Sequence, residues 1–255
     1  MNFRSYVYSV KQYLQNKTIC DELKKYKNIH KGQRCFIIGT GPSLTTDDLE
    51  LLKDEITFGS NRIFEIYTKT DWRPTYYMNQ DHQLIRKYIR EIGELDTNSV
   101  FLPIEFAEQY PKKKNMSYFV LRHRDFYPKD ADFSRNIHHY LGQGFTVTYG
   151  AIQMAYYMGF SEVYLLGIDH NYSISLNEKG VPVMNDGVQD YFKGSTASNK
   201  GLNLPRIVES TVAYMTARKF ANRQKNFTVY NATRGGKLEV FERVDLDEIL
   251  MTKEK

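Results

Sequence analysis

A short apolar run that leads into a glycine-containing turn is the feature that most constrains this sequence. Residues 34–38 (RCFII) read as a buried strand, residues 39–44 (GTGPSL) as a tight turn, and the apolar positions from Leu49 onward as a helix. Apolar runs of this length, bounded by turn residues, are typical of strands that are buried on both faces. A strand that passes through such a turn into a helix is the repeating unit of an α/β fold.

The same alternation of strand and helix continues along most of the chain. Strands that alternate with helices form a mostly parallel sheet with helices on both faces. We therefore expect an α/β fold with a Rossmann-like, doubly wound and mostly parallel sheet. The expected strands are 34–38, 56–60, 75–78, 99–102, 116–121, 162–169 and 227–231, and the expected helices are 6–26, 82–92, 149–158, 205–223, 246–250 and one that begins between 45 and 49.

Three parts of the chain follow from this pattern. Residues 1–33 form an N-terminal helical extension, and residues 34–255 form a single nucleotide-binding domain. Residues 170–204 are polar, contain several Gly and Asn, and have no helical or strand period. Loops of this length are usually functional or disordered. Because this one leaves a strand end, where open α/β sheets bind ligands, we interpret it as a lid over the site.

Composition limits the class of protein and its compartment. The two cysteines, Cys20 and Cys35, cannot build a disulfide framework, which favours a cytoplasmic location. The net charge of +5 is too small to indicate a dedicated nucleic-acid binder. No run approaches the roughly 20 apolar residues of a membrane span. The basic and aromatic helix 6–26 leaves two roles open, a cap on the domain or a surface for peripheral membrane contact.

The turn after the first strand suggests a site for a phosphate. Gly39 and Gly41 allow the backbone to approach a ligand closely, and a helix that follows would offer free amides. The third glycine of the dinucleotide fingerprint is replaced by Leu44. The acid expected after the second strand is replaced by Asn61, which argues against a nicotinamide dehydrogenase. Asn61 and Asn79 follow successive strands and offer neutral amides beside a nucleotide, although each could equally cap its strand.

Several short motifs together resemble one superfamily. Residues 37–44 (IIGTGPSL), Asn61, Asn79, residues 164–169 (YLLGID) and residues 229–236 (VYNATRGG) occur in that order. This order resembles the bacterial sialyltransferases of glycosyltransferase family 42 and the related DUF115 group. That group includes motility accessory factors, which are nonulosonic-acid transferases, and archaeal hydroxymethylpterin diphosphokinases. The resemblance runs from about residue 34 to the C-terminus.

The resemblance implies which residues bind the donor. In the sialyltransferases the matching turn and asparagines contact a CMP-sugar, a late strand end contacts the ribose and base, and a small polar turn touches the donor. One departure stands out, because the histidine base of that family lies in the lid and residues 171–203 contain no histidine. The implied contacts are Thr40, Gly41, Ser43, Asn61, Asn79, Gly167, Ile168, Asp169, Thr146 and Thr148, with Gly39 in the same turn.

The catalytic base must therefore come from another position. A base has to reach the acceptor hydroxyl and have a pKa near the working pH. His170 and His82 each follow a predicted strand end, and either could titrate near neutrality. Asp190, in the lid, could serve if burial raised its pKa. Our candidates are His170, His82 and Asp190, with the alternative that His170 is only a polar residue oriented by its neighbour.

Three functions remain open at this stage. The first is a glycosyltransferase that uses a nucleotide-activated sugar, such as a CMP-nonulosonic acid, to modify a surface glycan or glycolipid by direct inverting displacement. This function needs no cofactor, and no metal site is expected for it. The second is a pterin diphosphokinase, which would need Mg²⁺ to neutralise ATP. The third is a nucleotide-binding module without catalysis.

Overall fold

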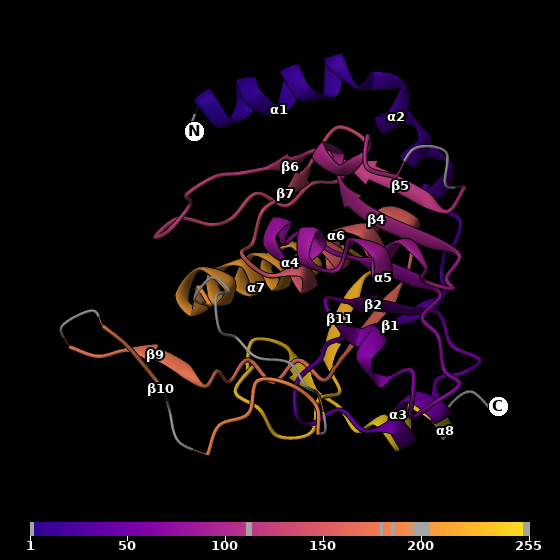
Figure 1. The fold of residues 1–255 in the computed structure, drawn as a ribbon, viewed down its shortest axis with the longest axis vertical. Helices are drawn as coiled ribbons and strands as arrows, with labels where there is room; N and C mark the ends of the chain where they lie inside the picture. The colour runs from indigo at the N-terminus through magenta and orange to yellow at the C-terminus, as the bar shows by residue number, and fades with distance from the viewer. Residues whose placement is uncertain are drawn as a thin grey trace.

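The computed structural model describes residues 3–110, 114–178, 181–184, 187–193, 195 and 205–251. Its centre is one eight-stranded sheet in the order β12-β11-β8-β1-β2-β3-β4-β5, and every neighbouring pair in it is parallel (Figure 1). This confirms the predicted doubly wound α/β fold. The strands are β1 (Arg34–Ile38), β2 (Thr57–Ser60), β3 (Tyr76–Met78), β4 (Ser99–Pro103), β5 (Met116–Phe119), β8 (Glu162–Leu166), β11 (Thr228–Asn231) and β12 (Glu242–Arg243).

Both faces of the sheet are covered, as the apolar strands require. Along β1, Cys35 and Ile37 belong to one core cluster, while Phe36 and Ile38 belong to a second cluster on the opposite face. The first cluster is closed by α6 (Val147–Met158) and α7 (Ile207–Ala221). The second is closed by α3 (Thr46–Leu51), α4 (His82–Lys87), α5 (Ile89–Gly93) and α8 (Leu246–Met251).

Two of the predicted helices are broken into shorter ones. The expected helix 6–26 is α1 (Phe3–Gln15), α2 (Lys17–Asp21) and the 3-10 helix η1 (Glu22–Tyr26). The break lies at Asn16, whose backbone leaves the helical region (φ −116°, ψ 25°) and whose amide side chain donates to the carbonyl of Gln12. The expected helix 82–92 divides in the same way at Tyr88 (φ −117°, ψ 34°).

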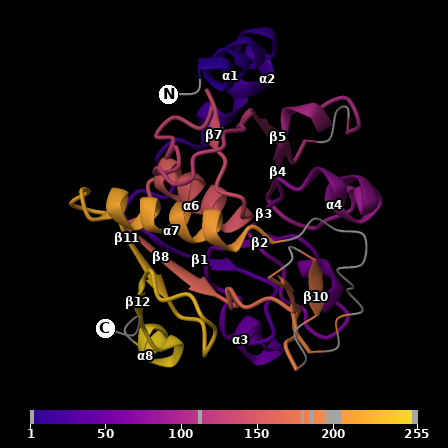
Figure 2. The ribbon, with the colours of Figure 1, turned by 90° about the vertical axis from the view of Figure 1, so that its left-hand side faces the viewer.

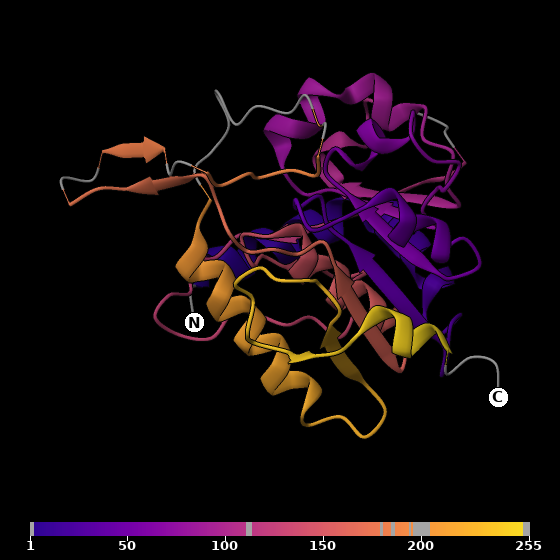
Figure 3. The same ribbon diagram turned by 90° about the horizontal axis from the view of Figure 1, so that it is seen from below.

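Several elements lacked a sequence signal because they are short. They include the parallel pair β6 (Leu121–Arg122) and β7 (Leu141–Gly142), and the 3-10 helices η2 (Ile63–Ile66) and η3 (Ile104–Phe106). Within the lid, β9 (Ile174–Leu176) and β10 (Pro182–Met184) form an antiparallel hairpin that projects from the body (Figures 1 and 3). The lid positions 179–180, 185–186, 194 and 196–204 lie outside the described residues.

The strand order determines where a ligand can enter. The chain lays β2 to β5 on one side of β1, and then returns to lay β8, β11 and β12 on the other side (Figure 2). The loops that leave β1 and β8 therefore diverge at the carboxyl edge of the sheet, which is where open α/β sheets bind ligands. Among the described residues, no helix has both the length and the apolar content needed to cross a membrane.

Candidate active site

A crevice of about 210 Å³ opens at the carboxyl ends of β1 and β8. The loops after β1, β2 and β8, the start of α6 and the lid all contribute to its walls. The structure therefore brings together most of the residues expected at the site, but Ser43, Asn79 and His82 are not among its lining residues. The expected residues that do line it are Gly39, Thr40, Gly41, Asn61, Thr146, Thr148, Gly167, Ile168, Asp169, His170 and Asp190.

The glycine turn after β1 is packed against the chain itself. The amide of Gly39 donates to the carbonyl of Leu166 (2.8 Å), and the amide of Gly41 donates to the carbonyl of Gly167 (3.0 Å). A Cβ on Gly39 would lie 2.3 Å from the Gly167 oxygen, and one on Gly41 would lie 1.9 Å from Oδ2 of Asp169. These glycines are required so that the turns after β1 and β8 can touch. Packing alone therefore accounts for both glycines, and the expectation that they also let a phosphate approach stays a prediction.

The start of α3 is partly occupied by side chains of the protein itself. Thr45 and Asp48 form a capping box, in which the Thr45 hydroxyl accepts from the Asp48 amide and the Asp48 carboxylate accepts from the Thr45 amide. Asp48 is further paired with Arg234. Ser43 donates its hydroxyl to Asp169 over 2.7 Å. These two carboxylates place negative charge beside the start of α3, which disfavours an anion there, and a phosphate at its free amides stays a prediction.

A second helix start, that of α6, faces the crevice and carries no side-chain cap. Thr146, Val147 and Thr148 all line the cavity, and Thr146 makes no capping hydrogen bond. The Thr146 hydroxyl lies 3.2 Å from the hydroxyl of Tyr214, which comes from α7 and also lines the cavity. Sequence reasoning missed Tyr214, because its spacing is that of an ordinary core position. The start of α6 presents backbone amides and three hydroxyls to a ligand.

The two asparagines have different surroundings. Asn61 has a left-handed backbone (φ 51°), which asparagine tolerates better than most residues, and it lines the crevice. Asn79 is fully buried; its amide donates to the Tyr77 hydroxyl (3.1 Å) and its oxygen accepts from the Asp81 amide (2.9 Å). The expected contact of Asn79 with the nucleotide is therefore replaced by a supporting role, since it holds the turn that carries Asp81 into the crevice.

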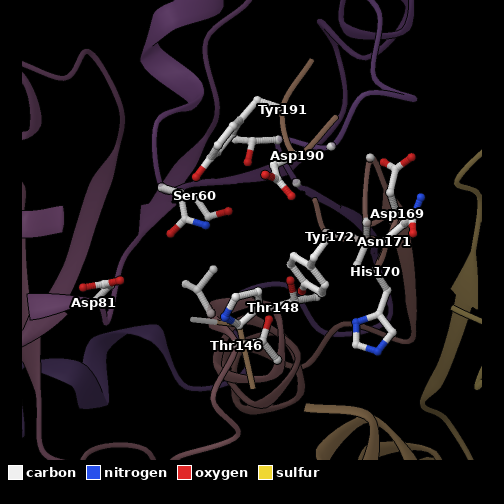
Figure 4. A pocket seen from close by; sticks show the side chains of 18 of the residues that line it. Ser60, Asp81, Thr146, Thr148, Asp169, His170, Asn171, Tyr172, Asp190 and Tyr191 are labelled. Atoms are coloured by element: carbon white, nitrogen blue, oxygen red, sulfur yellow. The ribbon is translucent and has the colours of Figure 1, made fainter. Parts of the chain in front are cut away.

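The three candidate bases also occupy different positions. Asp190 lines the crevice, where its carboxylate accepts hydrogen bonds from the amide and hydroxyl of Ser173. The His170 ring bonds to the Thr211 hydroxyl at 2.8 Å and lies beyond Tyr172, turned away from Asp81 (Figure 4). Burial lowers the pKa of His170 and so favours the neutral form of its ring.

His82 belongs to a second cavity, the adjoining groove, of about 690 Å³. The groove shares Asn61, Asp81, Thr146 and Tyr172 with the crevice, so the two cavities meet along these residues. Burial lowers the pKa of His82, whose ring packs against Phe106. A ligand bound in the crevice would thus have a neighbouring space for a second reactant.

The charges around the crevice are mostly negative. Asp81, Asp169 and Asp190 line it, and no Lys or Arg is among its lining residues in the described part of the chain. Burial raises the pKa of Asp169. Arg62 lies next to Asn61 in sequence, but it is 1% exposed and its guanidinium is covered by the Tyr191 ring at 4.2 Å. No group of three His, Cys, Asp or Glu side chains within the described ranges is arranged to hold a metal ion.

Comparisons with known proteins agree with this architecture. A family model described as 6-hydroxymethylpterin diphosphokinase MptE-like matches residues 5–175. Among solved structures, the MAf glycosyltransferase from Magnetospirillum magneticum AMB-1 has a similar fold, with a TM-score of 0.52 and 17% sequence identity. That match covers 92% of this chain and 41% of the glycosyltransferase, so the chain spans about two-fifths of its length. No curated protein matches the chain.

Proposed function

The chain belongs to the MptE-like family, and from this premise we propose that it is a glycosyltransferase that binds a nucleotide-activated sugar in the crevice. The proposal includes a donor with a single phosphate, such as a CMP-linked nonulosonic acid, and a glycan or glycolipid acceptor. The fold shared with a glycosyltransferase and the position of the crevice at the switch point support it.

The charge of the crevice is the observation that carries the choice of donor. A nucleoside triphosphate has several negative charges, whereas the lining holds three aspartates and, among the described residues, no Lys or Arg. A CMP-linked nonulosonic acid has fewer, one on its phosphate diester and one on the sugar carboxylate, and the α6 amides and the hydroxyls of Thr146, Thr148 and Tyr214 could bind the phosphate. A helix start contributes about 0.3–1 kcal/mol to such an anion, and up to about 2 kcal/mol where it is partly buried.

In this reaction the adjoining groove would hold the acceptor beside the donor. Asp190 is our proposed base, because it lines the crevice and Ser173 fixes the direction of its carboxylate. It would take the proton of the acceptor hydroxyl as that oxygen attacks the sugar carbon, and the bond to the phosphate would break. The amides at the start of α6 would stabilise the departing nucleotide, whose negative charge increases as that bond breaks.

A second candidate function is a pterin diphosphokinase, which the description of the matching family favours. The two functions differ in the nucleotide they bind and in their need for Mg²⁺. Calorimetric titration with CMP, UDP and ATP, each with and without Mg²⁺, separates them. Binding of CMP without metal supports the glycosyltransferase, and binding of only Mg²⁺-ATP would overturn it. If no nucleotide binds, the chain is a module of another kind and both enzymatic functions are wrong.

A substitution at Asn61 links that titration to the crevice. Asn61→Asp keeps the shape and the left-handed backbone but adds a negative charge beside the proposed phosphate. We expect CMP to bind at least about tenfold more weakly, which corresponds to about 1.4 kcal/mol. The matched control is Asn226→Asp, which adds the same charge in the exposed loop before β11, at the opposite edge of the sheet. If the two variants bind CMP with equal affinity, the phosphate does not lie beside Asn61.

A further inference from the structure

Helix α1 buries Ser9 beside the partly buried Val10 and Tyr13, and leaves other apolar side chains exposed to solvent. Ser9 is 1% exposed, and its hydroxyl accepts from Nε of Arg122 at 2.9 Å. The Ser5 hydroxyl donates to the carbonyl of His123. On the outer side, the side chains of Val7 and Leu14 are 45% and 63% exposed. A helix that only capped the domain would bury Val7 and Leu14 as well, since burial of apolar surface is the main gain of packing.

The exposed face of α1 also carries positive charge. Arg4, Val7, Lys11 and Leu14 are spaced i, i+3, i+7 and i+10, so they share one face, and all four are exposed. No acidic residue occurs before Asp21 in the sequence. Long basic side chains beside apolar ones can keep their charges at a polar surface while their stems cover apolar atoms.

We propose that this face, defined by Arg4, Val7, Lys11 and Leu14, rests on the surface of an anionic lipid bilayer. The combination of an apolar stripe with basic residues, on a helix too short to span, is that of an interfacial helix. Each basic residue near an anionic surface strengthens binding by about fivefold. The occupant follows from charge complementarity, because a neutral or basic partner would leave Arg4 and Lys11 without favourable contacts.

The position of α1 relates this surface to the adjoining groove. Figures 1 and 2 show α1 along one end of the molecule, beside β6 and β7. Leu121, in β6, and His123, whose carbonyl is bound by Ser5, both line the groove. Docking would therefore bring the groove near the headgroups, where a lipid-linked acceptor would lie. Docking itself does not depend on the proposed transferase activity.

Vesicle co-sedimentation tests the proposal on the full chain. The probes are vesicles of phosphatidylcholine alone and vesicles that also contain phosphatidylglycerol, each at low and high salt. We expect binding to the anionic vesicles that weakens with salt, because exposed charges are screened. The variants Val7→Gln with Leu14→Gln, and Arg4→Gln with Lys11→Gln, should each bind at least about tenfold more weakly. Val208→Gln, which changes a 54% exposed valine on α7, is the control and should bind as the parent does.

Three outcomes would overturn the proposal. In the first, the parent chain stays in the supernatant with anionic vesicles. In the second, both double variants remain folded by circular dichroism and sediment like the parent. In the third, light scattering shows that the parent is a dimer and that the double variant Val7→Gln with Leu14→Gln is a monomer. The exposed face of α1 would then bind a second copy of the chain.

Discussion

Replacing Gly41 by alanine tests whether the glycine turn serves packing or ligand binding. The new Cβ would lie 1.9 Å from Oδ2 of Asp169, far inside normal contact, so the carboxylate must move away. That movement breaks its hydrogen bond with the Ser43 hydroxyl, now 2.7 Å long. Losing a hydrogen bond to a charged group costs about 1.5–3 kcal/mol, and overpacking a filled site costs about 1–3 kcal/mol.

We therefore expect Gly41→Ala to lower the free energy of unfolding by about 2.5–6 kcal/mol. For a chain of this size the midpoint of thermal unfolding would fall by roughly 5–24 °C. The assay is urea unfolding of Gly41→Ala, Asp169→Ala and the double variant. Removing the Asp169 side chain removes the main clash, so Gly41→Ala should cost at least about 1.5 kcal/mol less in that background.

Two results would refute this reasoning. Additive effects in the cycle would mean that Gly41 and Asp169 do not compete for the same space. If Gly41→Ala unfolds like the parent but no longer binds nucleotide, the missing Cβ makes room for a ligand, as the sequence alone had suggested. Because stability and binding are measured separately, the packing and ligand explanations cannot be confused.

Three further substitutions have distinct expected outcomes. Asn79→Ala leaves the Tyr77 hydroxyl and the Asp81 amide without their buried partner, and should lower the free energy of unfolding in urea by about 1–3 kcal/mol; parental stability would contradict the supporting role. Asp190→Asn should slow release of nucleotide from the donor by about 10²–10⁴-fold while donor affinity is kept, and full turnover would exclude Asp190 as the base. Burial lowers the pKa of His138 to about 4, so the folded state binds fewer protons than the unfolded state below about pH 6.5. Protonation of this ring in the unfolded state lowers the free energy of unfolding as the pH falls from 6.5 toward 4, and His138→Gln should reduce the difference in unfolding free energy between pH 7 and pH 5; an unchanged difference would contradict this.

The sheet could be predicted from sequence because its signals are local. Apolar runs such as residues 34–38 identify a strand wherever they lie, and their alternation with helices identifies the parallel sheet. The strands and short helices that were missed, such as β12, have two to four residues and too few positions for a period.

The site was predictable in location but not in its internal contacts. The residues that follow β1, β2 and β8 meet at one edge, as the topology requires. Which groups satisfy the amides of Gly39 and Gly41 depends on Leu166 and Gly167, more than a hundred residues later in the chain. The supporting role of Asn79 likewise depends on its hydrogen bonds with Tyr77 and Asp81.

The pairing of β1 with β8 has a consequence for biosynthesis. Arg34 pairs with Glu162, so β1 waits for more than a hundred further residues to leave the ribosome before its second neighbour exists. At about 5–20 residues per second, translation imposes a delay of many seconds on this non-local contact. During that interval one edge of β1 is an open template for mispairing, and the crevice, which needs both strand ends, is among the last features to form.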